Sequence, residues 1–170
     1  MKYNSSIDSL TIKSSKENYI KKIKEDFDIL KKIKISSQHP QFKGQRYYKI
    51  IFDTLKELSM SNSNCKGTQY ACVYPDRPHQ VFISHRLFSL SHELRMAVII
   101  HEIYHLVYND LHVSCKSKKI LNYSCSNDIN SSFGLEYYFL EDLKNMDEYS
   151  NRQDIQDYQR GIKHRINSFW

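Results

Sequence analysis

The residues of this sequence best suited to act together in chemistry are two histidines and a glutamate, His101, Glu102 and His105. They form the pattern H-E-x-x-H. Residues four apart lie on one face of an α-helix, one turn from each other, so both imidazoles can reach the same metal ion. Imidazole nitrogen is a preferred ligand of zinc, and a glutamate beside the ion can act as a general base. The pattern therefore predicts a zinc ion held by His101 and His105, with Glu102 activating water.

The sequence around this short pattern makes a chance match a poor explanation. Almost every neighbouring residue is apolar, namely Leu94, Met96, Ala97, Val98, Ile99, Ile100, Ile103, Tyr104, Leu106 and Val107. A helix that is apolar on every side is a buried helix. Unpaired polar groups inside a protein cost about 2–7 kcal/mol each, so the two histidines need partners. A zinc ion is the favoured partner, and the alternative is a core helix whose histidines bond to backbone carbonyls.

Three residues compete to be the third protein ligand that a catalytic zinc ion usually has. His112 follows His105 by seven residues, and the turn at Asn109-Asp110 can bring it back toward the metal. Asp110 is itself the aspartate candidate. Glu136 is the glutamate candidate, because a carboxylate within an apolar helix stripe is out of place unless it is paired or metal-bound. Glu136 has a second role open to it, as the hydrogen-bond acceptor of a ligand histidine. We place His112 first and Glu136 second.

Length and composition indicate one globular domain. The chain has 170 residues, of which 40% are hydrophobic and 26% charged, and it has few glycines (4) and prolines (3). We predict an α+β, mainly helical fold, with a flexible lead-in at residues 1–15 and a single domain at 16–170. No apolar stretch approaches the ~20 residues that span a bilayer, and the first ten residues resemble no secretory signal. We therefore expect a cytoplasmic protein, or one exported without a recognisable signal, such as an effector.

The formal net charge of +6 comes largely from lysines between residues 13 and 34. A solvated helix face accounts for such a run without any partner. The run also lacks the interleaved aromatic residues and motifs of nucleic-acid binding proteins. We therefore expect a protein or peptide substrate and no nucleic acid, with the oligomeric state left open.

Four cysteines form two pairs, Cys65 with Cys72 and Cys115 with Cys125. Neither pair has the two-residue spacing of a zinc knuckle. Each pair could close a short loop as a disulfide in an oxidising compartment, or stay as free thiols in a reducing one. Cys115 with Cys125 is the better disulfide candidate, because this pair brackets a polar stretch close to the motif.

Hydrophobic periodicity predicts five helices, over residues 16–35, 44–60, 92–108, 133–146 and 152–167. Ser132 is the expected cap of the fourth. Two β-like runs, 69–74 and 80–84, flank a turn at 75–78 and indicate a hairpin or two strands of a small sheet.

With a strand, an H-E-x-x-H helix and a glutamate-bearing helix in this order, residues 81–140 resemble the small bacterial zincins, which are zinc metallopeptidases. Residues 134–140 are similar to the glutamate helix of gluzincin-type peptidases, although no Asn precedes Glu136. The resemblance implies a zincin-like fold with a small sheet or hairpin beside the motif helix. In zinc peptidases the strand before that helix lies beside the metal and binds substrate along its exposed edge, and residues 80–84 occupy that place.

Motif and resemblance together predict a zinc-dependent metallopeptidase that hydrolyses peptide bonds with metal-activated water. Glu102 would accept the proton of the water and pass it to the leaving amine. Tyr158, His164 and Tyr123 are candidates for the donor that stabilises the oxyanion. The alternative is a non-catalytic zinc-binding interaction module, or a toxin-like module, on the same scaffold. The intact Glu102 argues against it, because a structural zinc site has no use for a general base.

Overall fold

The computed structural model describes residues 3–7, 9–33, 35, 45–60, 65, 69–108 and 131–167. Its helices are α1 (Glu17–Leu30), α2 (Tyr47–Thr54), α3 (His92–Tyr108), α4 (Ser132–Lys144) and α5 (Gln153–Asn167), with a 3-10 helix, η1, at His85–Ser89. Its strands are β1 (Tyr3–Ile7), β2 (Leu10–Ser14), β3 (Glu57–Met60), β4 (Ala71–Cys72) and β5 (Gln80–Ile83). The predicted α+β, mainly helical class is confirmed. In this part of the chain no helix is long and apolar enough to cross a membrane.

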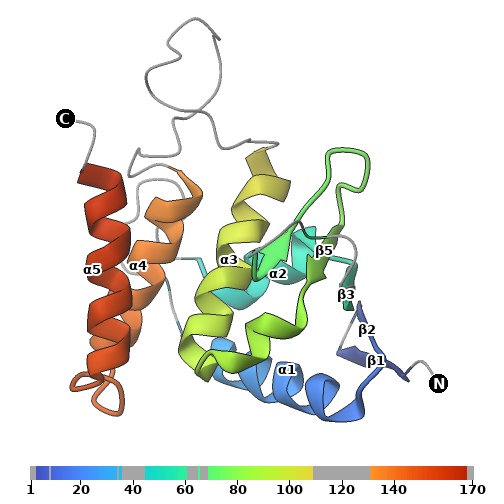
Figure 1. Cartoon of the computed structure of the whole chain (residues 1–170), viewed down its shortest axis with the longest axis horizontal. Helices are drawn as coiled ribbons and strands as arrows, with labels where there is room; N and C mark the ends of the chain where they lie inside the picture. The colour runs from blue at the N-terminus through green and yellow to red at the C-terminus, as the bar shows by residue number, and fades with distance from the viewer. Residues whose placement is uncertain are drawn as a thin grey trace, which may run out of the picture.

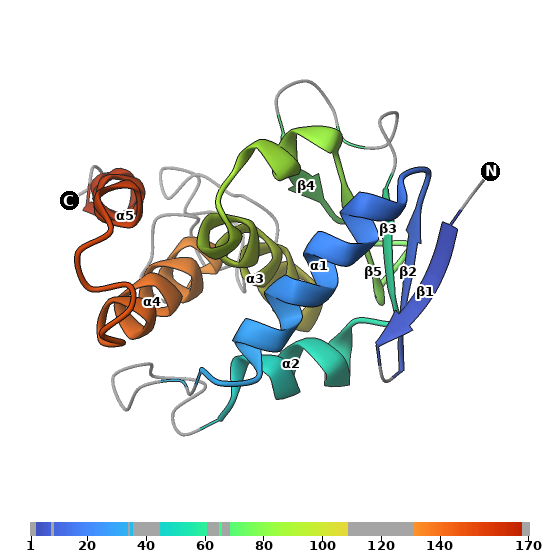
Figure 2. The ribbon, with the colours of Figure 1, turned by 90° about the horizontal axis from the view of Figure 1, so that it is seen from below.

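Helix α3, which carries the H-E-x-x-H motif, runs through the middle of the molecule (Figure 1). The sheet lies on one side of it with α1 and α2, and α4 and α5 lie on the other side (Figure 2). Every residue from Glu93 to His105 is buried. A helix covered on all sides must be apolar on all sides, which is the pattern that the sequence has here. The predicted bounds of this helix, 92–108, are confirmed.

The five strands form one mixed sheet in the order β1-β2-β3-β5-β4. The three central strands, β2, β3 and β5, are parallel to one another, and the two outer strands are antiparallel to their neighbours. Parallel neighbours need a long crossover connection, and α1 and α2 lie in the connection between β2 and β3. The sheet is therefore larger than the hairpin that the sequence indicates.

The prediction of a flexible lead-in at residues 1–15 is wrong. Strand β1 pairs with β2, and β2 pairs with the central strand β3. In β2, Leu10, Ile12 and Ser14 are buried, whereas Lys13 is exposed. A period-two pattern of five residues, set among serines and lysines, is too short to stand out in the sequence.

The helix predicted over residues 44–60 is also wrong in its second half. Helix α2 ends at Thr54, and Glu57–Met60 form β3 in the centre of the sheet. Leu55 and Leu58 are both completely buried. Two leucines three apart fit a helical stripe as well as a helix end followed by a strand, so a short apolar run does not separate the two.

The hairpin predicted from 69–74 and 80–84 is confirmed, because β4 and β5 pair in antiparallel register. The N–H of Arg77 donates to the carbonyl of Tyr74 at 3.0 Å and closes the turn that contains Pro75. The prediction that 80–84 offers an exposed edge is wrong, because β5 lies between β3 and β4. Its continuous apolar run is typical of an interior strand. The edge strand beside α3 is β4.

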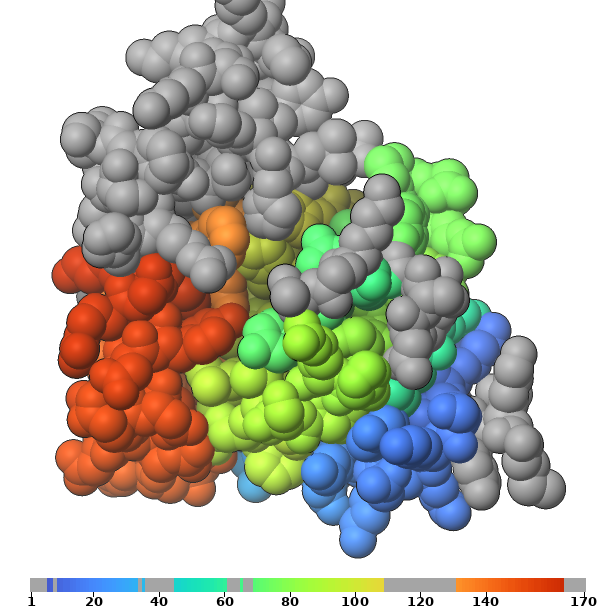
Figure 3. Space-filling model, viewed as in Figure 1, coloured from blue at the N-terminus to red at the C-terminus, as the bar shows by residue number. Residues whose placement is uncertain are grey.

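The start of α3 is fastened to α1 by a buried ion pair. Asp26 of α1 accepts hydrogen bonds from Nε and Nη2 of Arg95, both at 2.8 Å, and its Oδ1 lies 2.5 Å from Nδ1 of His92. Burial is the largest influence on the pKa of Asp26 and raises it, while Arg95 and His92 act in the opposite direction. In the space-filling view this end of α3 and η1 reach the surface between α1 and α5 (Figure 3). We assign the group of Asp26, Arg95 and His92 to stability.

One of the two cysteine pairs is joined in the structure. Cys65 and Cys72 form a disulfide, with their Cα atoms 5.6 Å apart. The pair that the sequence favours, Cys115 with Cys125, lies outside the described residues. Cys72 is the second residue of the edge strand β4, so the disulfide fixes the strand that faces α3.

Candidate metal centre and cleft

The two motif histidines converge on one point. Nε2 of His101 and Nε2 of His105 lie 3.2 Å apart, and both side chains are buried in the middle of the fold. Two nitrogen ligands about 2.0–2.1 Å from a tetrahedral zinc ion would lie about 3.3–3.4 Å apart. The separation of the two nitrogens therefore fits a shared metal ion.

A carboxylate on α4 orients the first of these histidines. Oε2 of Glu136 lies 3.0 Å from Nδ1 of His101, and the hydroxyl of Tyr158 on α5 donates to Oε1 at 2.8 Å. Because an ionised carboxylate only accepts hydrogen bonds, Nδ1 of His101 carries the ring proton. Nε2 then keeps its lone pair, which is the electron pair that a metal-bound histidine uses.

This contact gives Glu136 a definite place relative to the converging nitrogens. Nδ1 and Nε2 stand on different sides of the imidazole ring, so the carboxylate bonded to Nδ1 of His101 lies away from an ion on Nε2. In this arrangement Glu136 positions a histidine, which is the second of the two roles open to it from the sequence. Among the residues that the structure places, no group of three or more His, Cys, Asp or Glu side chains is arranged to hold a metal. His112 and Asp110 lie outside the described residues, so the third ligand stays a prediction.

Glu102 is buried beside the histidines, and only 8% of its surface is exposed. Burial raises the pKa of its carboxyl group to about 7; the electrostatic influence of the His101 ring lowers this pKa, and the neighbouring Glu136 carboxylate raises it further. A carboxyl group with a pKa near neutrality can take up and release a proton at neutral pH, as a general base must. The position and the pKa of Glu102 both fit the role that the sequence predicts.

A cleft of about 170 Å³ opens in front of these groups. One wall is formed by residues 69–71, at and just before the edge strand β4, and the other by Phe133 and Tyr158 from α4 and α5. His101, Glu102 and Glu136 line it between the two walls. The motif therefore faces a hollow that a small part of another molecule can enter.

The N-terminus of α4 shapes one side of this cleft. The side chain of Ser131 accepts a hydrogen bond from the N–H of Gly134 at 3.4 Å, so Ser131 caps the helix. The predicted cap, Ser132, is wrong by one residue. The helix that begins here places the ring of Phe133 edge-on to the ring of His101, with 4.6 Å between the centroids.

The backbone of β4 faces the cleft. The N–H of Ser84 donates to the carbonyl of Tyr70 at 2.9 Å, which makes this pair a hydrogen-bonded one. In an antiparallel ladder the two kinds of pair alternate, so the next pair, Ala71 with Ile83, is a non-hydrogen-bonded pair. The N–H and C=O of Ala71 consequently point away from β5, and Ala71 lines the cleft. An extended chain could bond to these groups as an added strand.

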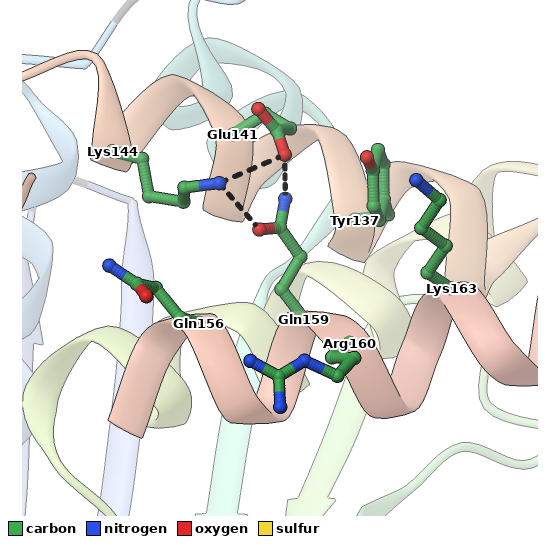
Figure 4. Close-up of a pocket in the computed structure, with 7 residues that line it drawn as sticks. All are labelled: Tyr137, Glu141, Lys144, Gln156, Gln159, Arg160 and Lys163. Carbon is green, nitrogen blue, oxygen red and sulfur yellow. Dashed lines mark hydrogen bonds and ion pairs between the residues drawn. The ribbon is translucent and has the colours of Figure 1, made fainter. Parts of the chain in front are cut away.

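A second hollow, of about 460 Å³, lies between α4 and α5 and shows how α5 is held (Figure 4). Lys144 donates to Gln159 at 3.0 Å and to Glu141 at 3.3 Å, and the Gln159 amide also donates to Glu141. Gln159 follows Tyr158 directly. We therefore assign this network to docking α5 against α4, which brings the Tyr158 hydroxyl to Glu136.

Of the three oxyanion candidates, Tyr158 alone has a described side chain, and it lines the cleft. Tyr123 and the side chain of His164 lie outside the description. The sequence did not predict that Phe133 and residues 69–71 line the cleft. One signal for residues 69–71 was available: the run 80–84 is too continuously apolar for an edge strand, which leaves the edge to its hairpin partner.

Comparisons of the chain with models of protein families, with curated proteins and with solved structures return no match. The chemistry of this chain is therefore inferred from its own residues and their geometry.

Proposed function

We propose that the protein is a zinc-dependent metallopeptidase. The observation that carries the proposal is the convergence of Nε2 of His101 and Nε2 of His105, 3.2 Å apart in a buried helix. Glu102 lines the same cleft as His101. Two neutral imidazoles and a carboxylate form a donor set suited to zinc, and water activation by such a centre is the chemistry of peptidases.

The chemistry divides between the metal and the chain. When bound, zinc would lower the pKa of its water toward 7 and polarise the scissile carbonyl. Glu102, with a pKa of about 7, accepts the water proton and delivers it to the leaving amine. Glu136 holds the Nδ1 proton of His101 and thereby keeps Nε2 directed at the ion.

Two further assignments belong to this proposal. Because both oxygens of Glu136 are engaged, by His101 and Tyr158, we assign the third ligand position to His112. The outward backbone of Ala71 gives an extended peptide a strand edge on which to dock across the cleft. This strand edge favours a protein or peptide segment in extended form as the substrate.

The decisive experiment measures zinc content and cleavage of a peptide library by the wild type and Glu102→Gln. The wild type should bind zinc and lose activity with a chelator. Glu102→Gln should keep zinc and lose turnover by about 10²–10⁴-fold, because only the base is removed. Full activity of Glu102→Gln would refute the mechanism. A wild type that binds zinc and cleaves nothing would favour the non-catalytic module.

A parallel measurement settles the third ligand. Zinc content of His112→Ala should fall to that of His101→Ala, while Glu136→Ala should retain a weakened site. The opposite order would move the assignment from His112 to Glu136.

A further inference from the structure

The strand that borders the cleft is held to the sheet by very few backbone contacts. Strand β4 has two residues, and its register with β5 consists of Ala71 with Ile83 and Cys72 with Phe82. Short edge strands of this kind open easily, because few hydrogen bonds must break. The groups of Ala71 that face the cleft therefore depend on something else for a fixed position.

The Cys65–Cys72 disulfide supplies that support. Both sulfurs belong to a small cluster with Phe82 and Tyr74 that is separate from the main core. The rings of Tyr74 and Phe82 meet edge to face, with centroids 5.6 Å apart. Sγ of Cys65 also lies 3.5 Å from the carbonyl oxygen of Phe82. Because this sulfur is in a disulfide and has no proton to donate, the contact is a packing contact and not a hydrogen bond. The disulfide thus ties β4 to Cys65, which itself packs against Phe82 of β5.

We infer that the Cys65–Cys72 disulfide is a redox-sensitive positioning element for the substrate. When the bond is intact, it holds the N–H and C=O of Ala71 at the cleft, and when it is reduced, β4 loosens and substrate binds more weakly. The inference rests on the proposed peptidase function. Neither cysteine touches the substrate; both act through the backbone of Ala71.

Reduction by a dithiol is a balanced exchange. The Cys65–Cys72 bond takes two electrons and two protons and becomes two thiols, while the two thiols of the reductant become its own disulfide. The converging histidines are not part of this change, because α3 is held by the main core and by α4. Reduction should therefore leave zinc in place and change substrate binding alone.

The test uses full-length Cys115→Ser/Cys125→Ser, in which Cys65 and Cys72 are the remaining cysteines. The disulfide is reduced with a trialkylphosphine, which becomes its oxide with oxygen from water. The amide of Ser84, which donates to Tyr70 across the β4–β5 pair, should exchange hydrogen on the order of tenfold faster. The amide of Ile100 in α3 should not change.

On an extended peptide substrate, KM should rise on the order of tenfold on reduction, while kcat stays within about twofold and zinc content is constant. The matched control is Cys65→Ser/Cys72→Ser in the wild-type background, which should have the high KM and fast Ser84 exchange without any reductant. Unchanged exchange at Ser84 would overturn the inference, and so would faster exchange with an unchanged KM. Absence of cleavage in both redox states would overturn the proposed function instead, whatever Ser84 does.

Discussion

Two histidines of α3 bond through Nδ1 to a carboxylate from another helix, but the two carboxylates have different second partners. His92 meets Asp26 of α1 at 2.5 Å, and His101 meets Glu136 of α4 at 3.0 Å. The first carboxylate is also held by Arg95 through two hydrogen bonds. The second is held by the hydroxyl of Tyr158, which is neutral.

The two carboxylates differ in whether a neighbouring cation neutralises their charge. Asp26 faces a permanent guanidinium cation, so its charge is neutralised whatever His92 does. The Tyr158 hydroxyl donates a hydrogen bond to Glu136 without neutralising it, so the charge remains to strengthen His101 as a ligand. One turn after His101 stands His105, whereas one turn after His92 stands Met96. A histidine–carboxylate pair therefore becomes a candidate metal site through its second histidine and through a carboxylate that no arginine or lysine among the described residues neutralises.

Removing each histidine is the strongest test of this contrast. His101→Ala should lose bound zinc and lower kcat/KM on the order of 10³-fold or more, because a ligand of the proposed metal is gone. His92→Ala should keep zinc content, with kcat/KM within about twofold of the wild type. Zinc loss in His92→Ala, or a fully loaded His101→Ala, would erase the distinction between the two pairs.

Breaking the first pair should cost stability. Arg95→Met leaves Asp26 buried without its cation, and the free energy of unfolding should fall by about 3–5 kcal/mol in urea denaturation. The zinc affinity of the folded protein should not change. Lys49→Met, which breaks an exposed ion pair with Asp53, is the control and should cost about 0–1 kcal/mol. An effect of Arg95→Met as small as that of Lys49→Met would show that Asp26 does not need Arg95.

Breaking the second pair should cost metal affinity. Glu136→Gln removes the charge behind His101, and zinc affinity measured by chelator competition should fall about 10–100-fold. Asp26→Asn, the matched change in the other pair, should leave that affinity unaltered. If Glu136→Gln loses all zinc, as His101→Ala does, then Glu136 is a direct ligand and not a positioning residue.

The smallest effect on zinc affinity is expected at Tyr158, which acts on His101 only through Glu136. Tyr158→Phe deletes one hydrogen bond to Glu136, worth about 0.5–1.5 kcal/mol, so zinc affinity should fall about two- to tenfold. Tyr19→Phe, on α1, serves as the control and should have no effect. A loss at Tyr158→Phe larger than that at Glu136→Gln would mean that Tyr158 acts in some other way than through Glu136.

The sequence predicts only the local features of the two histidine–carboxylate pairs. The bounds of α3 and the identity of its histidines follow from a continuous apolar segment and a four-residue spacing, both local signals. The misplaced carboxylate at Glu136 was also visible, because polarity within an apolar stripe marks a paired group. Its partner was left open between a metal ion and a ligand histidine.

The rest depends on contacts between distant parts of the chain. Asp26 lies 66 residues before His92, and no periodicity connects them. The place of β4 at the sheet edge follows from strand order, which is decided by how β3 inserts between β2 and β5. Both are tertiary outcomes, so a pattern within one segment does not contain them.

Because α3 lies in the middle of the fold, its complete burial must wait for a helix that is synthesised after it. The ribosome finishes α3 at Tyr108, and α4, which covers one flank of it, begins at Ser132. At about 5–20 residues per second, that flank stays uncovered for seconds after the helix has been made. An apolar helix exposed for that time is prone to aggregation until α4 packs against it, and this helix is the segment that carries the proposed chemistry.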